Sequence, residues 1–232
     1  MSSDSSHYMF KHHPETCDPD DHWGQVKRTI NGKPVSPEQI ALIVTTIKNG
    51  LSLAGDDVLL DLCCGNGALT THLFEICRGG LGVDYSDFLI GVANQRFTRG
   101  PSERYRLADA LDYVRTESDP QAFTKILCYG AFPYFSHDAA HGLLQGLSER
   151  FDRATHLFLG QMPDKTRMKA FFADRDPAPG EEDDPASLLG IWRTPAELAA
   201  LAEAAGWTAR CERMPAHFFA SHYRFDAVLT RS

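Results

Sequence analysis

The sequence DVLLDLCCGNGALT, residues 57–70, decides the fold of this chain. An apolar run rich in Val and Leu reaches Asp61, a turn containing Gly65 and Gly67 follows, and the chain then becomes apolar again. This order predicts a buried strand, a tight turn and a helix start, because glycine has no Cβ to prevent close approach of backbone or ligand. In an open α/β sheet, ligands bind at such a turn, outside the carboxyl ends of the strands.

A second short apolar run, LGVD, ends in Asp84, which lies 17 residues after Gly67. A carboxylate can accept hydrogen bonds from two neighbouring hydroxyls, and acids at this offset commonly hold a ribose. We therefore expect Asp84 to bind the ribose of a nucleoside-containing cofactor. The alternative is an aspartate that only forms the turn before Tyr85 and Ser86.

The spacing of the glycines separates two kinds of cofactor. Dinucleotide-binding turns usually follow G-x-G-x-x-G/A, but Thr70 occupies the third position here. Asp61, four residues before the first glycine, is poorly placed beside a pyrophosphate and suits a cationic ligand better. An Asp61 that merely caps the turn is the other interpretation.

Strand-like and helix-like segments alternate around this turn. The alternation predicts a mostly parallel sheet with helices on both faces. Two final strands, WTARCERM and YRFDAVLT, have no crossover helix between them, which predicts an antiparallel pair at the sheet edge. The other expected strands are 57–62, 80–84, 104–107, 124–129 and 155–160, and the expected helices are 37–50, 67–77, 86–98, 137–150 and 194–206.

Two segments depart from this rhythm. Residues 1–35 are polar and rich in histidine, with scattered apolar residues, and predict an N-terminal arm or lid packed partly on the body. The body is expected to be one domain, 36–232. Within it, about 163–193 reads as an insert with four prolines and the acidic run 181–184. A connection of this length is more often functional or mobile, whereas the acidic run itself is typical of solvated surface.

The composition limits the partners of the chain. The net charge of −8 argues against a broad nucleic-acid footprint, which depends on Lys and Arg. No apolar run approaches the ~20 residues that span a bilayer, so we expect no membrane segment. The six cysteines lack paired C-x-x-C motifs, which favours buried thiols in a reducing cytoplasm over zinc. We predict no metal site.

Four stretches occur in an order that resembles the motifs of class I S-adenosylmethionine-dependent methyltransferases: DLCCGNGALT, LGVDYS, ADALDY (108–113) and ILCYGAFPYF (126–135). The resemblance covers roughly residues 37–230. It implies a Rossmann-like, doubly wound, mostly parallel seven-stranded sheet with an antiparallel last strand, and S-adenosyl-L-methionine as cofactor. The residues implied to bind that cofactor are Asp61, Cys63, Gly65, Asn66, Gly67, Asp84, Tyr85, Asp109, Ala110 and Cys128.

Some of these residues have a second interpretation. Asp109 is implied to hold the adenine amino group, but it also fits a helix N-cap, which aspartate favours. Tyr85 is expected either to lie against the adenine or to be on the surface. Asn66 is a candidate cap for the next helix. Arg28, in the arm, is expected to hold a carboxylate of cofactor or substrate through its planar fork, or else to lie on the surface.

The methyl acceptor is expected beyond the fourth strand, near 128–134. Tyr134 is a candidate for orienting or deprotonating the acceptor, although packing on the cofactor fits it at least as well. His137 is a candidate base, since histidine titrates near neutrality, but it also fits an ordinary helix cap. Trp23, Gln25 and Arg28, with the loop 215–222, are candidates for a lid and an acceptor pocket.

We therefore expect a methyltransferase that acts on an oxygen or nitrogen atom of a small molecule. The segment lacks the Asn/Asp-Pro-Pro-Tyr/Phe motif used for amino groups of nucleic-acid bases. The alternatives are a nucleic-acid (RNA) methyltransferase, an NAD-dependent oxidoreductase and a non-catalytic cofactor-binding domain. The oligomeric state does not follow from these patterns.

Overall fold

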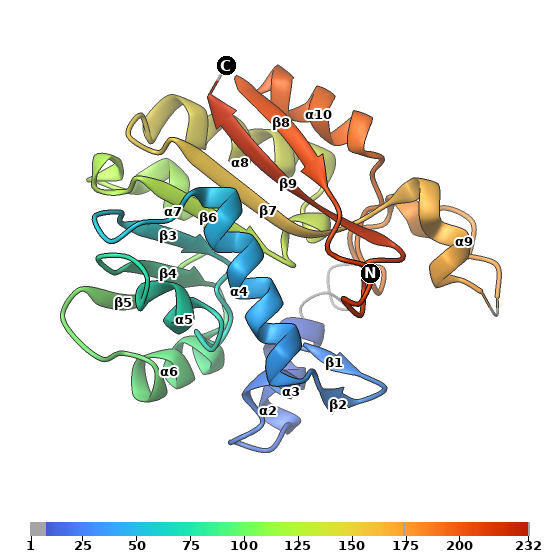
Figure 1. Ribbon diagram of the computed structural model, residues 1–232, viewed down its shortest axis with the longest axis horizontal. Coiled ribbons are helices and arrows are strands. Elements are labelled where there is room, and N and C mark those ends of the chain that lie inside the picture. The colour runs from blue at the N-terminus through green and yellow to red at the C-terminus, as the bar shows by residue number, and fades with distance from the viewer. Residues whose placement is uncertain (1–7, 174, 232) are drawn as a thin grey trace.

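A single seven-stranded sheet forms the centre of the computed structural model, which describes residues 8–173 and 175–231 (Figure 1). The first seven residues of the predicted arm lie outside this described part. The strands are β3 (Leu59–Leu62), β4 (Gly80–Asp84), β5 (Glu103–Leu107), β6 (Lys125–Tyr129), β7 (His156–Pro163), β8 (Trp207–Glu212) and β9 (Arg224–Arg231).

The order of the strands is β5-β4-β3-β6-β7-β9-β8. The strands from β5 to β7 are parallel, and β9 runs antiparallel between β7 and β8. The predicted fold is therefore confirmed, including the antiparallel last strand. Because β3 and β4 are parallel neighbours, with Asp61 opposite Gly82, the turn after β3 and Asp84 at the end of β4 lie at the same edge.

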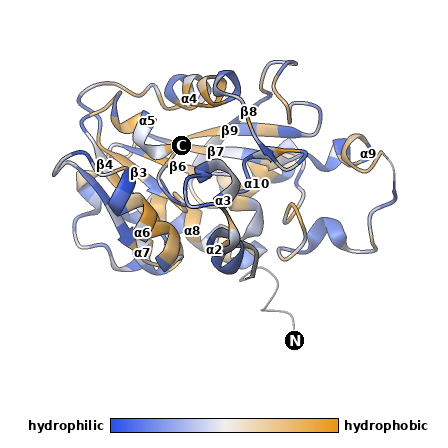
Figure 2. Cartoon of the chain, turned by 90° about the horizontal axis from the view of Figure 1, so that it is seen from below, coloured by the Kyte–Doolittle hydropathy of each residue, from blue (hydrophilic) through white to orange (hydrophobic). Residues whose placement is uncertain are grey.

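Helices cover both faces of the sheet, and Figure 2 shows α4 (Pro37–Leu51) on one side with α7 (Ala110–Thr116) and α8 (His137–Arg150) on the other. Ile43 and Ile47 of α4 pack with Leu59 of β3. Leu144 and Leu147 of α8 pack with Ile126 of β6. The main helices are α4 (Pro37–Leu51), α5 (Thr70–Phe74), α6 (Asp87–Arg96), α7 (Ala110–Thr116), α8 (His137–Arg150) and α10 (Pro195–Ala204).

Local capping explains where several helices begin. The hydroxyl oxygen of Ser136 accepts from the Ala139 amide, and α8 covers the predicted range. Thr194 and Glu197 form a capping box at the start of α10, in which each side chain bonds to the other's backbone. By contrast, α5 begins later than predicted because Gly67 has a φ of +79° and extends the turn.

The arm folds into short elements that lie below α4 in Figure 1. They are a π-helical turn (Tyr8–His12), α2 (His13–Thr16), α3 (His22–Gln25) and a two-stranded hairpin, β1 (Thr29–Ile30) and β2 (Lys33–Pro34). The described part of the insert likewise contains short helices, including α9 (Met168–Phe171), which projects to the right in Figure 1. None of the helices in the described chain has the length and apolarity needed to cross a membrane.

Candidate cofactor and acceptor site

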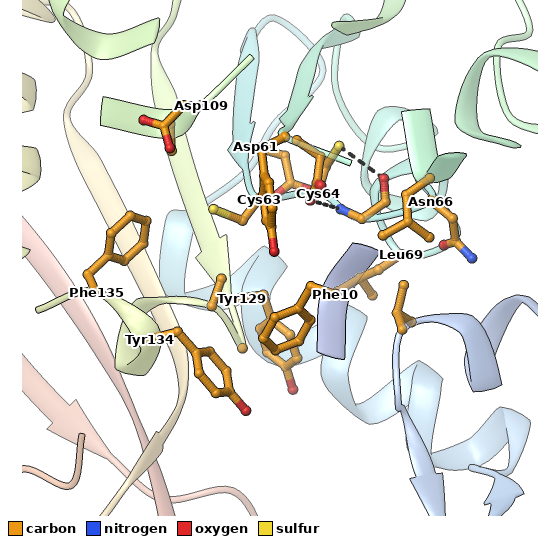
Figure 3. Close-up of a pocket in the computed structure, with 18 of the residues that line it drawn as sticks. Phe10, Asp61, Cys63, Cys64, Asn66, Leu69, Asp109, Tyr129, Tyr134 and Phe135 are labelled. Atoms are coloured by element: carbon orange, nitrogen blue, oxygen red, sulfur yellow. Dashed lines mark hydrogen bonds between the residues drawn. The ribbon is translucent and has the colours of Figure 1, made fainter. Parts of the chain in front are cut away.

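A cavity of about 380 Å³ lies at the carboxyl ends of β3, β4 and β6 and is bounded on one side by the arm (Figure 3). Its volume is in the usual range for small-molecule sites. Ten of the thirteen residues predicted for cofactor binding or catalysis line it. These are Arg28, Asp61, Cys63, Gly65, Asn66, Asp84, Tyr85, Asp109, Ala110 and Tyr134.

Asp84 connects the glycine turn to the end of β4. The amide of Gly65 donates to Asp84 Oδ2 and that of Ser86 donates to Asp84 Oδ1, each at 2.9 Å. Burial raises the pKa of the Asp84 carboxyl, and these backbone donors oppose that shift because they favour the charged form. The carboxylate is thus held in a fixed orientation and retains lone pairs for a ligand.

Asp61 is a second buried carboxyl in the same cavity, with 3% of its surface exposed. The hydroxyl of Thr70 donates to Asp61 Oδ2 at 2.5 Å. Burial raises the pKa of Asp61 to about 7, although Thr70 and the charge of Arg28 act in the opposite direction. A bound cation beside Asp61 would favour its ionised form, so the site suits a positively charged group.

Arg28 brings a positive charge to the cavity from the arm. Its guanidinium carbon lies 5.5 Å from the ring centroid of Trp23 and 5.1 Å from that of Tyr129. Burial lowers the pKa of Arg28, and nearby Asp61 opposes that effect. Within the described chain, the guanidinium forms no hydrogen bond or ion pair, which leaves its donors for an anionic ligand group.

Asn66 joins the glycine turn to the arm, a role that differs from the predicted helix cap. Its side-chain amide donates to the carbonyl of His22 at 2.7 Å and to Gln25 Oε1 at 2.9 Å. The next helix instead has Leu69 at its N-cap position. Gly65, with a φ of +59°, lies so close to the arm that a Cβ there would be 2.9 Å from a methyl group of Val26.

We predict that Asn66→Ala loosens the arm. Loss of the two hydrogen bonds that the Asn66 side chain makes to the arm costs roughly 1–2 kcal/mol, which corresponds to about tenfold more frequent local opening. Trypsin cleavage after the exposed Lys27, followed by mass spectrometry, should be faster by that factor. Asn49→Ala, at an exposed position of α4, is the matched control. Equal cleavage rates in the two variants would show that the arm is held by other contacts.

The opposite end of the cavity contains Asp109. Its Oδ1 accepts from the amides of Leu111 and Asp112 at 2.9 and 3.1 Å, so it caps α7 as one interpretation predicted. The residue is nevertheless exposed in the cavity wall, and its other oxygen has no hydrogen bond to the described residues. The capping and ligand-binding interpretations are therefore compatible.

Tyr134 lies among aromatic side chains, away from Asp61 and Asp109 (Figure 3). Its ring contacts Phe10 of the arm edge-on, with centroids 4.8 Å apart. Its hydroxyl donates to the carbonyl of Leu188 in the insert at 2.9 Å, and burial raises its pKa. The hydroxyl is thus engaged with the insert and the ring with the arm, which favours the packing interpretation.

Three predicted residues do not line the cavity. Gly67 faces the ring of Tyr105, where a Cβ would lie 2.8 Å from the nearest ring carbon. Cys128 is completely buried in the core beneath the cavity. His137 is exposed at the first position of α8, and the residue that caps this helix is Ser136, not His137.

The loop 215–222 also lies apart from the cavity wall. Gln39 of α4 holds it by donating to the carbonyl of His217 at 3.1 Å and accepting from the amide of Phe219 at 2.9 Å. Phe218 packs into the core beside α4. None of residues 215–222 lines this cavity, whereas Gln25 and Arg28 of the arm do, and the contribution of the loop to an acceptor pocket stays a prediction.

Several cavity residues were not singled out from the sequence. The aromatic residues Phe10, Tyr129 and Phe135 form much of the wall near Tyr134. The position of Tyr129 at the end of β6 was the one available signal, because parallel strands end at the ligand-binding edge. Phe10 gave no signal, since it reaches the cavity only through the folding of the arm.

Comparisons with known proteins agree with this geometry. Residues 59–151 match a family described as a methyltransferase domain. Over 95 residues, the chain is 32% identical to an uncharacterized methyltransferase of Schizosaccharomyces pombe. That match covers 38% of this chain and about a third (33%) of the yeast protein.

Solved structures share the fold over most of the chain. Magnesium protoporphyrin IX methyltransferase from Synechocystis, solved with bound SAH, superposes with a TM-score of 0.62 at 16% identity, covering 91% of this chain and 94% of that one. A cyclopropane synthase from Mycobacterium tuberculosis gives 0.64 at 14% identity, covering 99% and 94%. An N-methyltransferase from Bradyrhizobium japonicum gives 0.62 at 16% identity, covering 84% and 98%.

The matched domain contains β3, β4, β5 and β6 with the glycine turn, and the solved structures share the surrounding sheet. Residues 59–151 therefore form a methyltransferase domain, set in a fold that the chain shares with solved methyltransferases.

Proposed function

We propose that this protein transfers a methyl group from S-adenosyl-L-methionine to an oxygen or nitrogen atom of a small molecule by in-line displacement. The observation that carries the proposal is the pair of buried carboxyls, Asp61 and Asp84, at the ends of neighbouring strands in one cavity. Arg28 adds an opposite charge at the same site.

The groups in the cavity fit the chemistry of this cofactor. S-adenosylmethionine carries an ammonium, a carboxylate, a sulfonium, a ribose diol and an adenine. A carboxyl that is buried beside a cation, such as Asp61, suits the ammonium, and Arg28 suits the carboxylate. The fixed carboxylate of Asp84 suits the diol, and the second oxygen of Asp109 suits the adenine amino group.

The remaining lining residues complete the proposed binding site. Cys63, Gly65 and Asn66 form the turn along which the cofactor would lie, and Tyr85 and Ala110 lie beside the proposed adenine position. When bound, the cofactor supplies a methyl group that is already activated by its sulfonium. The protein then has to hold the acceptor atom about 3–3.5 Å from that methyl group and to exclude water.

The cavity wall supports a small-molecule acceptor. Phe10, Tyr129, Tyr134 and Phe135 provide aromatic surface, and the arm closes over the same region. A net charge of −8 gives no general attraction for nucleic-acid phosphates. We propose that the arm acts as a lid over the domain that begins at residue 36, because Asn66 ties it directly to the cofactor turn.

Calorimetry with S-adenosylhomocysteine, the demethylated product, tests the cofactor assignment directly. We expect binding of one molecule per chain with micromolar affinity, and no binding of NAD under the same conditions. Binding of NAD in place of the sulfur compound would refute the proposal and favour an oxidoreductase. Binding without turnover on any acceptor would favour a non-catalytic domain.

The affinity for S-adenosylmethionine should depend on pH through Asp61. Burial raises the pKa of Asp61 to about 7, so this group is neutral below that pH and attracts the cofactor ammonium less. For binding to the ionised form alone, affinity falls about tenfold between pH 8 and pH 6. Calorimetric titrations at several pH values measure this slope.

Asp61→Asn serves as the comparison, since it keeps the shape of the side chain and removes its titration. The variant should bind weakly, with a flat profile between pH 6 and pH 8. The protonation of Asp61 also affects the stability of the protein without ligand. A raised pKa means that the stabilising contribution of the neutral form is present at low pH and is lost as pH rises through about 7. A steep profile that persists in Asp61→Asn would place the titrating group elsewhere.

A further inference from the structure

A group of polar side chains, buried except for the partly buried Arg224, lies behind the aromatic wall of the cavity, and we call it the polar cluster. It consists of Tyr129 on β6, Gln161 on β7, and Arg224 and Asp226 on β9. Tyr129, Gln161 and Asp226 are all buried, with exposed fractions of 7%, 8% and 4%. The Gln161 amide donates to Asp226 Oδ1 at 2.8 Å, and the Arg224 guanidinium donates to the Gln161 carbonyl.

The backbone of the polar cluster is strained at one position. Gln161 has a φ of +64°, and the pairing between β7 and β9 shifts register between Leu159 and Met162. A left-handed conformation at a non-glycine residue costs roughly 1–3 kcal/mol, and such bulges often redirect side chains beside functional sites. The irregularity brings the Gln161 amide to Asp226.

Four buried atoms of the polar cluster have no hydrogen-bond partner among the described residues. They are the Tyr129 hydroxyl oxygen, Gln161 Nε2, Arg224 Nε and Asp226 Oδ2. Each unpaired buried polar atom costs roughly 1–3 kcal/mol, so four together indicate a place for water or a ligand group. Three of the atoms can donate and ionised Asp226 can only accept, a combination that suits a hydroxyl, which both donates and accepts.

Tyr129 connects the polar cluster to the cavity. Its ring lines the cavity and lies against Gly160, where a Cβ would be 2.2 Å from a ring carbon. Larger residues at 160 would displace this ring. The Tyr134 hydroxyl, by comparison, already donates to Leu188. The Tyr129 ring thus belongs to the cavity wall, while its unpartnered hydroxyl is buried against the polar cluster.

Resting on the proposed function, we infer that the methyl acceptor is a small phenol, that its hydroxyl bonds to that of Tyr129, and that its proton passes through Tyr129 to Asp226. The aromatic residues Phe10, Tyr134 and Phe135 suit the flat ring of such an acceptor. No direct hydrogen bond joins Tyr129 to Asp226, so a water molecule held by the unpartnered atoms completes the path.

The step balances in atoms and charge. The phenol oxygen forms its bond to the methyl carbon as the bond from that carbon to sulfur breaks, and the sulfur keeps the electron pair. The phenol proton moves to Tyr129, whose own proton moves through the water to Asp226. A neutral phenol, a sulfonium and a carboxylate thereby become an ether, a thioether and a neutral carboxyl. Asp226 acts through Tyr129 and is a positioning residue.

The charges around Asp226 set the pH at which it can accept a proton. Burial raises the pKa of Asp226 to about 6, while the Gln161 amide and the charge of Arg224 act against this shift. Tyr129 on β6, two strands away, is close enough for the charge of Asp226 to act on it. On the neighbouring strand β8, Glu212, ion-paired with Arg210, is the direct register partner of Asp226. Methylation should therefore rise with pH and level off above about 6.

A pair of matched acceptors tests the inference. S-adenosylmethionine is supplied with 4-methylphenol or with 4-methylaniline, which differ only in the acceptor atom, and methylated product is quantified by mass spectrometry. We expect methylation of the phenol and not of the aniline. Tyr129→Phe and Asp226→Asn should lower kcat by at least about tenfold and about 100-fold, with the KM for S-adenosylmethionine unchanged. The inflection near pH 6 should disappear in Asp226→Asn.

Two controls separate this role from a structural one. Tyr113→Phe removes another buried, unpartnered hydroxyl, in α7 and outside the cavity. Glu212→Gln changes the carboxylate opposite Asp226, which is exposed. Both should retain activity within twofold. Each variant is first checked for its melting temperature and for binding of S-adenosylhomocysteine.

The remaining outcomes are each decisive. Unchanged kcat and pH profile in Tyr129→Phe and Asp226→Asn would overturn the inference. The inference would also be overturned if protein that binds S-adenosylhomocysteine methylated the aniline alone or neither acceptor. These results would leave the proposed function intact. Failure of the wild-type protein to bind S-adenosylhomocysteine would instead refute the proposed function, and the inference with it.

Discussion

Asp84→Ala should weaken binding of S-adenosylmethionine and S-adenosylhomocysteine by about 100-fold or more. The substitution removes the proposed bonds to the ribose diol, and bonds to a charged acceptor contribute roughly 1.5–3 kcal/mol each. It also leaves the amides of Gly65 and Ser86 without their partner, so the glycine turn loses its connection to β4. Calorimetry with both ligands measures the loss.

Binding has to be separated from folding in this experiment. The melting temperature of Asp84→Ala should fall, because two buried amides become unpaired, and titrations are therefore performed well below it. Asp87→Ala, an exposed position in the first turn of α6, is the matched control and should bind like the wild type. Folded Asp84→Ala protein with undiminished affinity would remove Asp84 from the site and undermine the proposed cofactor geometry.

The second large effect is expected from Gly80→Ala, which should prevent stable folding. A Cβ at this position would lie 1.9 Å from the carbonyl oxygen of Leu59 on the neighbouring strand. The backbone of β3 or β4 has to move, because neither partner is a flexible side chain. Overpacking typically costs about 1–3 kcal/mol, and a backbone clash in the central sheet belongs at or above the top of that range. Denaturant unfolding measures the loss.

Gly91→Ala provides a comparison of the same chemistry in open surroundings. Gly91 lies in α6, and nothing is within 4 Å of its added Cβ. Alanine is a better helix former than glycine by about 0.5–1 kcal/mol, so this variant should be slightly stabilised. If Gly80→Ala unfolds at the same denaturant concentration as the wild type, the spacing of β3 and β4 is not as tight as described here.

Regular elements and their order follow from local patterns in this chain. The apolar run before Asp84 gave both ends of β4, and the predicted range 137–150 matches α8, because these signals lie within the elements themselves. The carboxyl ends of parallel strands meet at one edge, so the proximity of Asp61 and Asp84 was predictable as well. The position of the antiparallel β9 followed from the family resemblance.

Contacts between distant segments account for what the sequence did not reveal. The Tyr134 hydroxyl bonds to a carbonyl 54 residues later, and Asn66 bonds to a carbonyl 44 residues earlier. Both partners are backbone carbonyls, which every residue has, so the sequence does not indicate which residue will accept the hydrogen bond. Asp226 lies in a strand pattern that gives no sign of the bulge at Gln161. The surroundings of Tyr134, Asn66 and Asp226 are set by segments distant in the sequence, and local spacing does not predict them.

The hydrogen bonds of Asn66 also couple the proposed cofactor site to the arm. One residue belongs both to the turn beneath the proposed cofactor and to the contact with the covering arm. Coupled sites affect each other equally, so a ligand that tightens the turn must also tighten the cover. We therefore expect S-adenosylhomocysteine to make opening of the arm rarer, and loss of the Asn66 contacts to the arm to weaken its binding by the same factor.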